Sequence, residues 1–188
     1  HWQQQISGVV QGLSAVYFTS AQEGWIVGED GLVLYTADGG LHWVPKPYSP
    51  KNIFLDLYFI DEQTGWMVCD GGVILHTTDG GLSWQHQYSG TNKYLYAIYF
   101  TDKQRGWVTG ESGAILHTED GGKNWAPQTS GTTYALSGVH FTDNQNGWVV
   151  GFFGAWVPIS AIYHTSDGGA NWGQQQLLDS FMLLQDIY

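Results

Sequence analysis

Short apolar runs recur along the chain, separated by turns rich in glycine and aspartate. Runs of β-branched and aromatic residues bounded by such turns are typical of strands. In the first complete unit the pattern predicts strands at Leu13–Phe18, Trp25–Gly28 and Leu32–Thr36, with a fourth starting at Trp43. The tripeptide Glu29-Asp30-Gly31 supplies the turn between the second and third strands. Each unit is therefore expected to be a small sheet of four strands.

An eight-residue motif precedes the fourth strand of every unit. It starts with threonine, contains Asp-Gly-Gly and ends in tryptophan. A sharp turn needs glycines that adopt positive φ and a short carboxylate that accepts N–H bonds, and the tryptophan ring packs back over the turn. We therefore expect a structural role for the aspartate and tryptophan of each copy: Asp38, Trp43, Asp79, Trp84, Asp120, Trp125, Asp167 and Trp172.

A second marker, Gly-Trp, recurs every 41 residues, at Trp25, Trp66, Trp107 and Trp148. A fixed period of this length in a strand-rich sequence indicates a propeller or a solenoid. A flat β-solenoid favours shorter periods with one strand per face, whereas two hairpins per period match a propeller blade. The predicted fold is all-β, a propeller of four-stranded antiparallel blades with Asp-box turns.

The two ends of the chain align with parts of further units. His1-Trp2 resembles the end of a fifth motif, and 184–188 aligns with a first strand. We expect one segment of a larger propeller of about six to eight blades, with four complete blades and two partial ones. The expected divisions are an outer strand and linker at 1–12, blades at 13–48, 54–89, 95–130 and 136–176, and a linker with a first strand at 177–188.

Composition and charge exclude several classes of function. The chain is 43% hydrophobic, which is sufficient for a core. Six Lys and Arg against 17 Asp and Glu give a net charge of −11, so nucleic acid and anionic membrane surfaces are disfavoured as partners. No stretch is long and apolar enough to span a bilayer. Cys69, the single cysteine, excludes an intrachain disulfide and stands where other units have glycine, which indicates a structural role.

Three elements together are more specific than the Asp-box alone: Gly-Trp-x-Val-Gly, Asp-Gly-Gly-x-x-Trp and Gln-x-Ser-Gly. Their combination resembles the repeat of the photosystem II stability/assembly factor family of Asp-box (BNR repeat) propellers, over essentially the whole chain. The resemblance implies a non-enzymatic scaffold or assembly subunit outside the cytoplasm, in the periplasm, thylakoid lumen or at the cell surface. It also implies protein partners such as a membrane-protein complex.

The chain departs from the photosynthetic members of that family in its arginines. In those members a cluster of arginines is associated with partner recognition, whereas Arg105 is the only arginine of this chain. We therefore expect a non-photosystem bacterial relative, or a segment of one.

The repeated polar residues do not predict catalysis or metal binding. One boxed aspartate per blade is spread around a ring, whereas glycoside hydrolysis needs two carboxylates about 5–10 Å apart. His76, His117 and His164 recur before the box, too far apart for one metal ion, and are expected at surface or interblade strand positions. We therefore expect no catalytic residue, no metal and no cofactor.

One loop breaks the repeat and is the candidate partner-binding site. From Gly151 to Thr165 the fourth blade has six more residues than the first has between Gly28 and Thr36. An exposed apolar loop is a typical contact site, although this one would alternatively fold over its own propeller. The predicted contact residues, in loop 152–160, are Phe152, Phe153, Trp156, Val157, Pro158 and Ile159. The apolar linker at 177–183 is a weaker candidate.

Two other functions stay open. The first is an Asp-box glycoside hydrolase whose catalytic carboxylates lie partly outside this segment. A sialidase of that type would need three arginines to hold a substrate carboxylate, and this chain has one. The second is a structural repeat within a large surface protein.

Overall fold

The computed structural model describes residues 5, 7–46, 48, 51–153 and 159–175. Within these residues sixteen strands form four separate four-stranded antiparallel sheets, here named blades A to D in chain order. In every blade the strands follow one another in sequence order, so each blade is a simple meander of three hairpins. The predicted all-β propeller architecture is confirmed.

Blade A contains β1 (Leu13–Phe18), β2 (Gly24–Gly28), β3 (Val33–Thr36) and β4 (Val44–Pro45). Blade B contains β5 (Phe54–Phe59), β6 (Gly65–Cys69), β7 (Val73–Thr77) and β8 (Gln85–Tyr88). Blade C contains β9 (Leu95–Phe100), β10 (Gly106–Gly110), β11 (Ala114–Thr118) and β12 (Ala126–Thr129). Blade D contains β13 (Ala135–Phe141), β14 (Gly147–Phe153), β15 (Ile159–Thr165) and β16 (Gly173–Gln175). Single turns of 3-10 helix follow the second strand of blades A, B and C, at Glu29–Gly31, Asp70–Gly72 and Glu111–Gly113.

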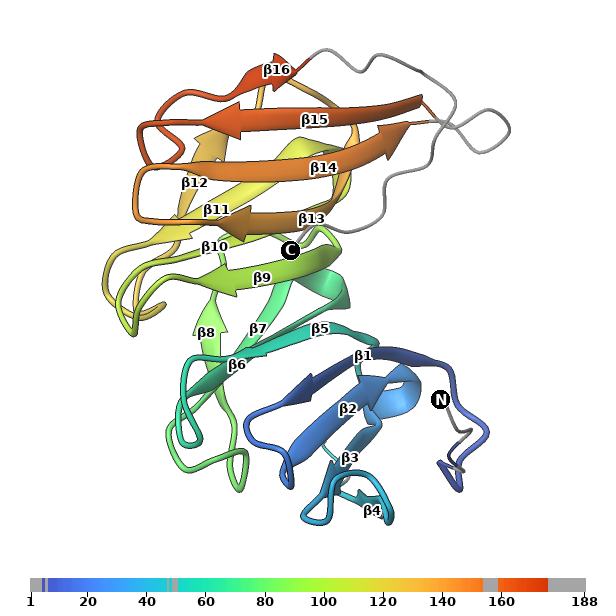
Figure 1. Cartoon of the computed structure of the whole chain (residues 1–188). Coiled ribbons are helices and arrows are strands. Elements are labelled where there is room, and N and C mark those ends of the chain that lie inside the picture. The colour runs from blue at the N-terminus through green and yellow to red at the C-terminus, as the bar shows by residue number, and fades with distance from the viewer. Residues whose placement is uncertain (1–4, 6, 47, 49–50, 154–158, 176–188) are drawn as a thin grey trace.

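The blades succeed one another along an arc, with blade A at the bottom and blade D at the top of Figure 1. Their first strands, β1, β5, β9 and β13, contact one another in that order and form the inner side of the arc. Because the strands of each blade alternate in direction, the turn after the first strand and the Asp-box turn lie at the same end of the blade. This end is called the box end below.

The Gly-Trp glycines are required by an aromatic ring. In blade C the Phe100 ring covers Gly106 so closely that a Cβ built there would lie 2.5 Å from a ring atom. The glycine after the second strand faces backbone instead, and a Cβ on Gly110 would lie 2.2 Å from the Tyr94 carbonyl oxygen. Blade B has Cys69 at that position, fully buried, and burial raises the pKa of its thiol. Its burial agrees with the structural role expected for it.

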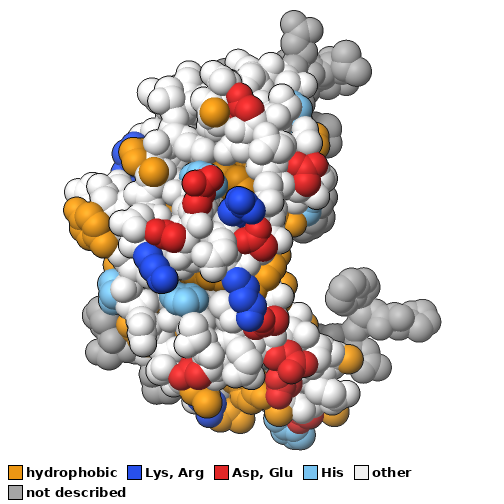
Figure 2. Space-filling model, turned by 90° about the vertical axis from the view of Figure 1, so that its left-hand side faces the viewer, with side chains coloured by type: hydrophobic (Ala, Val, Ile, Leu, Met, Phe, Trp, Pro, Cys, Tyr) orange, Lys and Arg blue, Asp and Glu red, His pale blue; other side chains and the backbone are white. Residues whose placement is uncertain are grey.

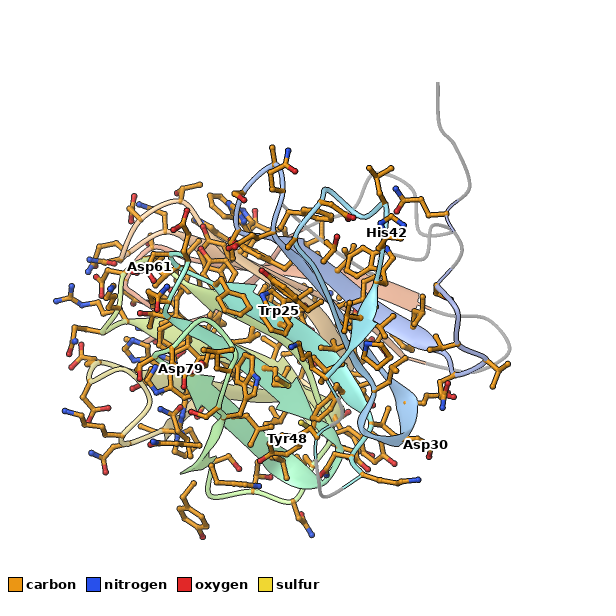
Figure 3. The ribbon with its side chains drawn as sticks, turned by 90° about the horizontal axis from the view of Figure 1, so that it is seen from below. Trp25, Asp30, His42, Tyr48, Asp61 and Asp79 are labelled. Carbon is orange, nitrogen blue, oxygen red and sulfur yellow. The ribbon has the colours of Figure 1, made fainter. Side chains whose placement is uncertain are left out.

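The hydrophobic core lies between blades. Each of three clusters joins one blade to the next, and at its centre a second-strand tryptophan meets the last phenylalanine of the following first strand. The ring centroids are 3.6 Å apart for Trp66 and Phe100 and for Trp107 and Phe141, with nearly parallel planes. Figure 3 shows Trp25 inside the molecule, with Asp79 toward the box end. Neighbouring blades therefore stabilise each other.

The lengthened hairpin of blade D differs from the expected loop. β14 and β15 continue pairing beyond Gly151, with Phe152 opposite Ser160 and Phe153 opposite Ile159. The ends of the predicted loop are therefore strand, because the insertion prolongs the hairpin ladder. Its tip, at 154–158, lies outside the described residues.

Candidate functional site

Each Asp-box is held by its own threonine and aspartate. In blade C the Thr118 hydroxyl donates to an Asp120 carboxylate oxygen at 2.9 Å and accepts the Gly122 N–H at 2.8 Å. The same carboxylate oxygen accepts the N–H of Asn124 at 2.9 Å. The other three boxes repeat these bonds. The boxed aspartates are thus all engaged in closing their turns.

Hydrogen bonds keep the boxed carboxylates ionised. The backbone N–H of His42 lowers the pKa of Asp38 to about 2, and the Ser83 hydroxyl does the same for Asp79. The side-chain amide of Asn171 lowers the pKa of Asp167 to about 2. A carboxyl group that stays ionised far below neutral pH is poorly suited to act as a general acid.

The recurring histidines stack on tryptophans. The ring centroids of His76 and Trp66 are 4.9 Å apart, and those of His117 and Trp107 are 4.7 Å apart. Burial lowers the pKa of both histidines, so they are neutral at pH 7. In the described part of the chain no three His, Cys, Asp or Glu side chains gather as metal ligands would.

The boxed tryptophans are also committed to packing. Each lies edge-on to the last phenylalanine of its own first strand, at centroid distances of 5.9–6.0 Å, in the pairs Trp43–Phe18, Trp84–Phe59, Trp125–Phe100 and Trp172–Phe141. The same contact in every blade stabilises the blade itself.

The predicted contact residues of blade D are not brought together by the described structure. Phe152 is half-buried in β14, and Phe153 and Ile159 are paired strand residues. Trp156, Val157 and Pro158 lie outside the described residues. The hypothesis of a contact loop at 152–160 therefore stays a prediction.

A groove lies between blades B and C at the box end. It has a volume of about 640 Å³. One wall is β8, and the other is the Asp-box turn of blade C. Charged and aromatic side chains that line it include His86, Tyr88, Lys103, Asp120 and Lys123, and the Asp120 carboxylate is bonded within its own box. We call it the B/C groove, and it is the candidate functional site.

Cations at this end of blade C depart from the repeat. Lys103 takes the place of glutamate in blade B and asparagine in blade D, and Lys123 takes the place of leucine, leucine and alanine in the other three boxes. With Arg105, these account for three of the six Lys and Arg residues of the chain. Figure 2, which looks onto this side of the molecule, shows Lys and Arg interspersed with acidic side chains.

The three cations differ in their partners. The Lys103 ammonium lies 2.5 Å from an Asp61 carboxylate oxygen, and this bond lowers the pKa of Asp61 to about 2. The Arg105 guanidinium lies 3.3 Å from Asp102. Among the described residues Lys123 forms no ion pair within 4.0 Å, and it is exposed. Lys123 is therefore the cation of the groove that a ligand would meet directly.

The two walls of the groove are fastened to each other. The side-chain amide of Gln87 in β8 donates to the Gly121 carbonyl oxygen at 2.8 Å, and the Trp125 indole donates to the oxygen of the same amide at 3.3 Å. On the inner side an Asp56 carboxylate oxygen accepts the Ile98 N–H at 2.9 Å. Blades B and C are thus linked by polar bonds at the outer and inner ends of their contact.

Lys103 and Lys123 are not among the site residues predicted from the sequence, because both lie in turns whose expected role is structural. The available signal was variation between aligned units: each lysine breaks the residue pattern of the other blades.

A second concavity lies on the inner side of the arc and has a volume of about 710 Å³. It is lined by residues of all four first strands, including Ser14, Asp56, Tyr96 and Ser137. Asp56 is the only carboxylate in its described lining. Since a glycosidase needs a pair, the described residues do not form such a site. The part of the chain that the structure describes also contains no helix with the length and apolarity to cross a membrane.

Solved structures with the same fold include YCF48 proteins and GH74 enzymes. A YCF48 protein bound to a D1 peptide is 18% identical with a TM-score of 0.62, and the match covers 87% of this chain and 80% of that one. YCF48 from Cyanidioschyzon merolae is 22% identical with a TM-score of 0.67, covering 90% and 58%. An ancestral GH74 enzyme is 16% identical with a TM-score of 0.75, covering 94% and 27%. The chain thus spans little more than half of the Cyanidioschyzon merolae protein and about a quarter of the GH74 enzyme.

At these identities the structural matches show the shared fold. A search of curated proteins by sequence found no match. The model of the photosynthesis system II assembly factor YCF48 family matches three overlapping stretches, 1–88, 48–129 and 83–182, which together include nearly the whole chain. This chain therefore belongs to the YCF48 family of BNR-repeat proteins.

Proposed function

We propose that this protein is a non-enzymatic scaffold or assembly subunit that binds an extended segment of a partner protein in the B/C groove. The observation that carries the proposal is the set of repeat-breaking cations at a preformed groove, in a family whose structures include a YCF48 protein bound to a D1 peptide. Side chains that depart from a repeat are not needed by the blade that carries them, and are free to specify a ligand.

The groove has the features of a peptide site. β8 is the outer strand of its sheet, so one edge of its backbone is free to pair with an added strand. Tyr88, 86% exposed, supplies an aromatic surface, and Lys123 supplies a cation without an ion-pair partner in the described structure. We therefore propose a segment with an acidic group beside an apolar side chain.

We further propose that the protein acts outside the cytoplasm, on a membrane-protein complex such as a photosystem. This rests on the family and on the D1 peptide named with one of its structures.

Peptide binding tests the proposal directly. The D1 peptide of the YCF48 complex, and a copy in which every carboxyl group including the C-terminus is amidated, should be titrated against the chain by calorimetry. We expect binding of the first peptide, at least about tenfold weaker binding of the second, and a similar loss with Lys123→Glu.

The matched control is Lys93→Glu, which makes the same charge change on the linker after β8, where the Lys93 ammonium bonds the Ser112 carbonyl at the opposite end of the blades. Equal losses from both variants would show a general charge effect and contradict the groove. If the D1 peptide does not bind, other acidic peptides should be screened: a peptide that binds and is weakened by Lys123→Glu alone would show that the groove is right and the D1 peptide is not its ligand.

A second candidate is a glycoside hydrolase, favoured by the shared fold of the GH74 enzyme; Asp56 in the inner concavity would supply one carboxylate, and the second would lie outside the described residues. The Asp56 carboxylate accepts the N–H groups of Leu57 and Ile98, which fixes it in the strand bulge. Release of reducing sugar from xyloglucan, lost on Asp56→Asn, would favour this candidate over the scaffold.

A further inference from the structure

The outer strands of blades A and C carry a proline that the outer strand of blade B lacks. Pro45 in β4 and Pro127 in β12 each lie opposite the leucine of the third strand, and His86 takes that position in β8. Proline has no N–H to donate, and on an outer strand it prevents a further strand from pairing. Blade D has Gln174 there, but the residues that follow β16 lie outside the described ones. Blade B therefore has a backbone donor where both of its neighbours have none.

This donor points away from its own sheet. In blade A the residue after the proline, Lys46, donates its N–H to the Val33 carbonyl oxygen at 2.7 Å. Successive N–H groups of a strand point to opposite sides, so the position before it faces outward. The register of β8 is the same, with Gln87 in the place of Lys46. The backbone of His86 and of Tyr88 therefore faces outward, and among the described strands β8 pairs with β7 alone.

We infer that the partner segment binds as a fifth strand of blade B, paired with the backbone of β8. This inference rests on the proposed function and specifies the form of the segment. Side chains of a strand alternate between its two faces. The Gln87 side chain points to blade C, where it bonds the Gly121 carbonyl, so those of His86 and Tyr88 lie on the other face. An added strand would therefore direct one row of side chains toward the box of blade C, which carries Lys123, and the other row along the face of Tyr88.

Charge and exposure set what each row contains. Lys123 is exposed and has no ion pair within 4.0 Å in the described part of the chain, so the row toward blade C would be acidic. Tyr88 is 86% exposed, and its ring offers an apolar surface to the other row. The occupant is thus a segment of a partner protein in which acidic and apolar side chains alternate.

The probe is a peptide of about eight residues in which glutamate and valine alternate, blocked at both ends and titrated by calorimetry. We expect it to bind, and His86→Pro to weaken binding by at least about tenfold because one backbone donor is lost. Circular dichroism and thermal unfolding should stay unchanged, since blades A and C hold proline at this position. The matched control is His86→Ala, which removes the imidazole and keeps the N–H. It should bind the peptide within about twofold of the unchanged chain.

Two modified peptides test the pairing without any change in the chain. One is N-methylated on its glutamates and the other on its valines. Only one of these sets of N–H groups faces β8, so one peptide should lose binding and the other should keep it. Equal effects of the two methylations would overturn strand addition. So would equal losses from His86→Ala and His86→Pro, or no binding of the unmodified peptide.

The outcomes also separate this inference from the proposed function. If the D1 peptide is weakened by Lys123→Glu but not by His86→Pro, the groove stands and strand addition fails. If the alternating peptide is weakened by His86→Pro while the D1 peptide does not bind, strand addition stands and the D1 peptide is not the ligand.

Discussion

Two junctions built from the same repeat, A/B and B/C, differ in how closely their central aromatic rings pack. In the B/C junction the Trp66 and Phe100 centroids are 3.6 Å apart, and the Trp66 indole donates to the Gly121 carbonyl at 3.4 Å. In the A/B junction the Trp25 and Phe59 centroids are 6.1 Å apart, and among the described residues the Trp25 indole has no such bond.

The two junctions also differ in one side chain that follows the boxed tryptophan on the outer strand. Gln87 reaches from blade B to the box of blade C, whereas the residue at the same repeat position of blade A is Lys46, whose ammonium lies 6.0 Å from the Tyr35 ring centroid. The cation stays on its own blade. The comparison teaches that the repeat specifies the blade, while a few positions set how firmly two blades are joined.

The largest expected effect comes from removing the central indoles. Trp66→Ala deletes a fully buried ring and should lower the free energy of unfolding by about 3–5 kcal/mol. Trp25→Ala should lower the free energy of unfolding by about 1 kcal/mol less than Trp66→Ala does, because the Trp25 indole has no such hydrogen bond among the described residues. Urea denaturation of both variants measures the difference. Equal losses would mean that the closer stacking adds nothing to stability.

Removing the outer-strand link should have an intermediate effect. Gln87→Leu removes one of the two donors to the Gly121 carbonyl and leaves the Trp125 indole without its acceptor, and should destabilise the chain by about 1–3 kcal/mol. Lys46→Leu at the matched position should change stability by less than about 0.5 kcal/mol. Amide exchange at Gly122 should quicken only in the first variant, and quickening in both would contradict the assignment.

The smallest difference between the junctions should appear on acidification, because their boxes are alike. The pKa of Asp38, Asp79 and Asp167 is about 2 in the folded chain, below the ordinary value of 3.8. A lowered pKa gives stability that is present above about pH 4 and lost as the pH falls toward 2. The thermal unfolding temperature, measured from about pH 5 to about pH 2, should fall over this range. Asp38→Asn and Asp79→Asn should each make that fall smaller, and by equal amounts.

Much of the fold was predictable because its causes are local. The Asp-Gly-Gly turn and the glycine beneath the phenylalanine ring are set by backbone geometry that recurs in every blade. The starts of some strands were not: β4 begins at Val44, one residue after the predicted Trp43, because the boxed tryptophan belongs to the turn. Strand pairing beyond Gly151 also depended on a partner strand that the pattern alone does not specify.

The candidate site was harder to predict for a physical reason. The groove is formed by β8 of one blade and the Asp-box turn of the next, so its lining is set by how blades pack. Lys123 is an ordinary exposed residue within its own turn and becomes a candidate ligand contact only when that turn lies across the groove from β8. Loop length predicts a site at Trp156 instead, and Trp156 lies outside the described residues.

Asp56 gives the B/C groove a property that the other junctions lack. Blades A, C and D have alanine or glycine at this bulge, so only here does a carboxylate bond the next first strand, to Ile98. Together, Asp56 and Gln87 hold blades B and C to each other at the inner and outer sides of their contact. A peptide that binds in the B/C groove would therefore meet walls that are already in place, and the conformational entropy lost on binding would be mainly that of the peptide.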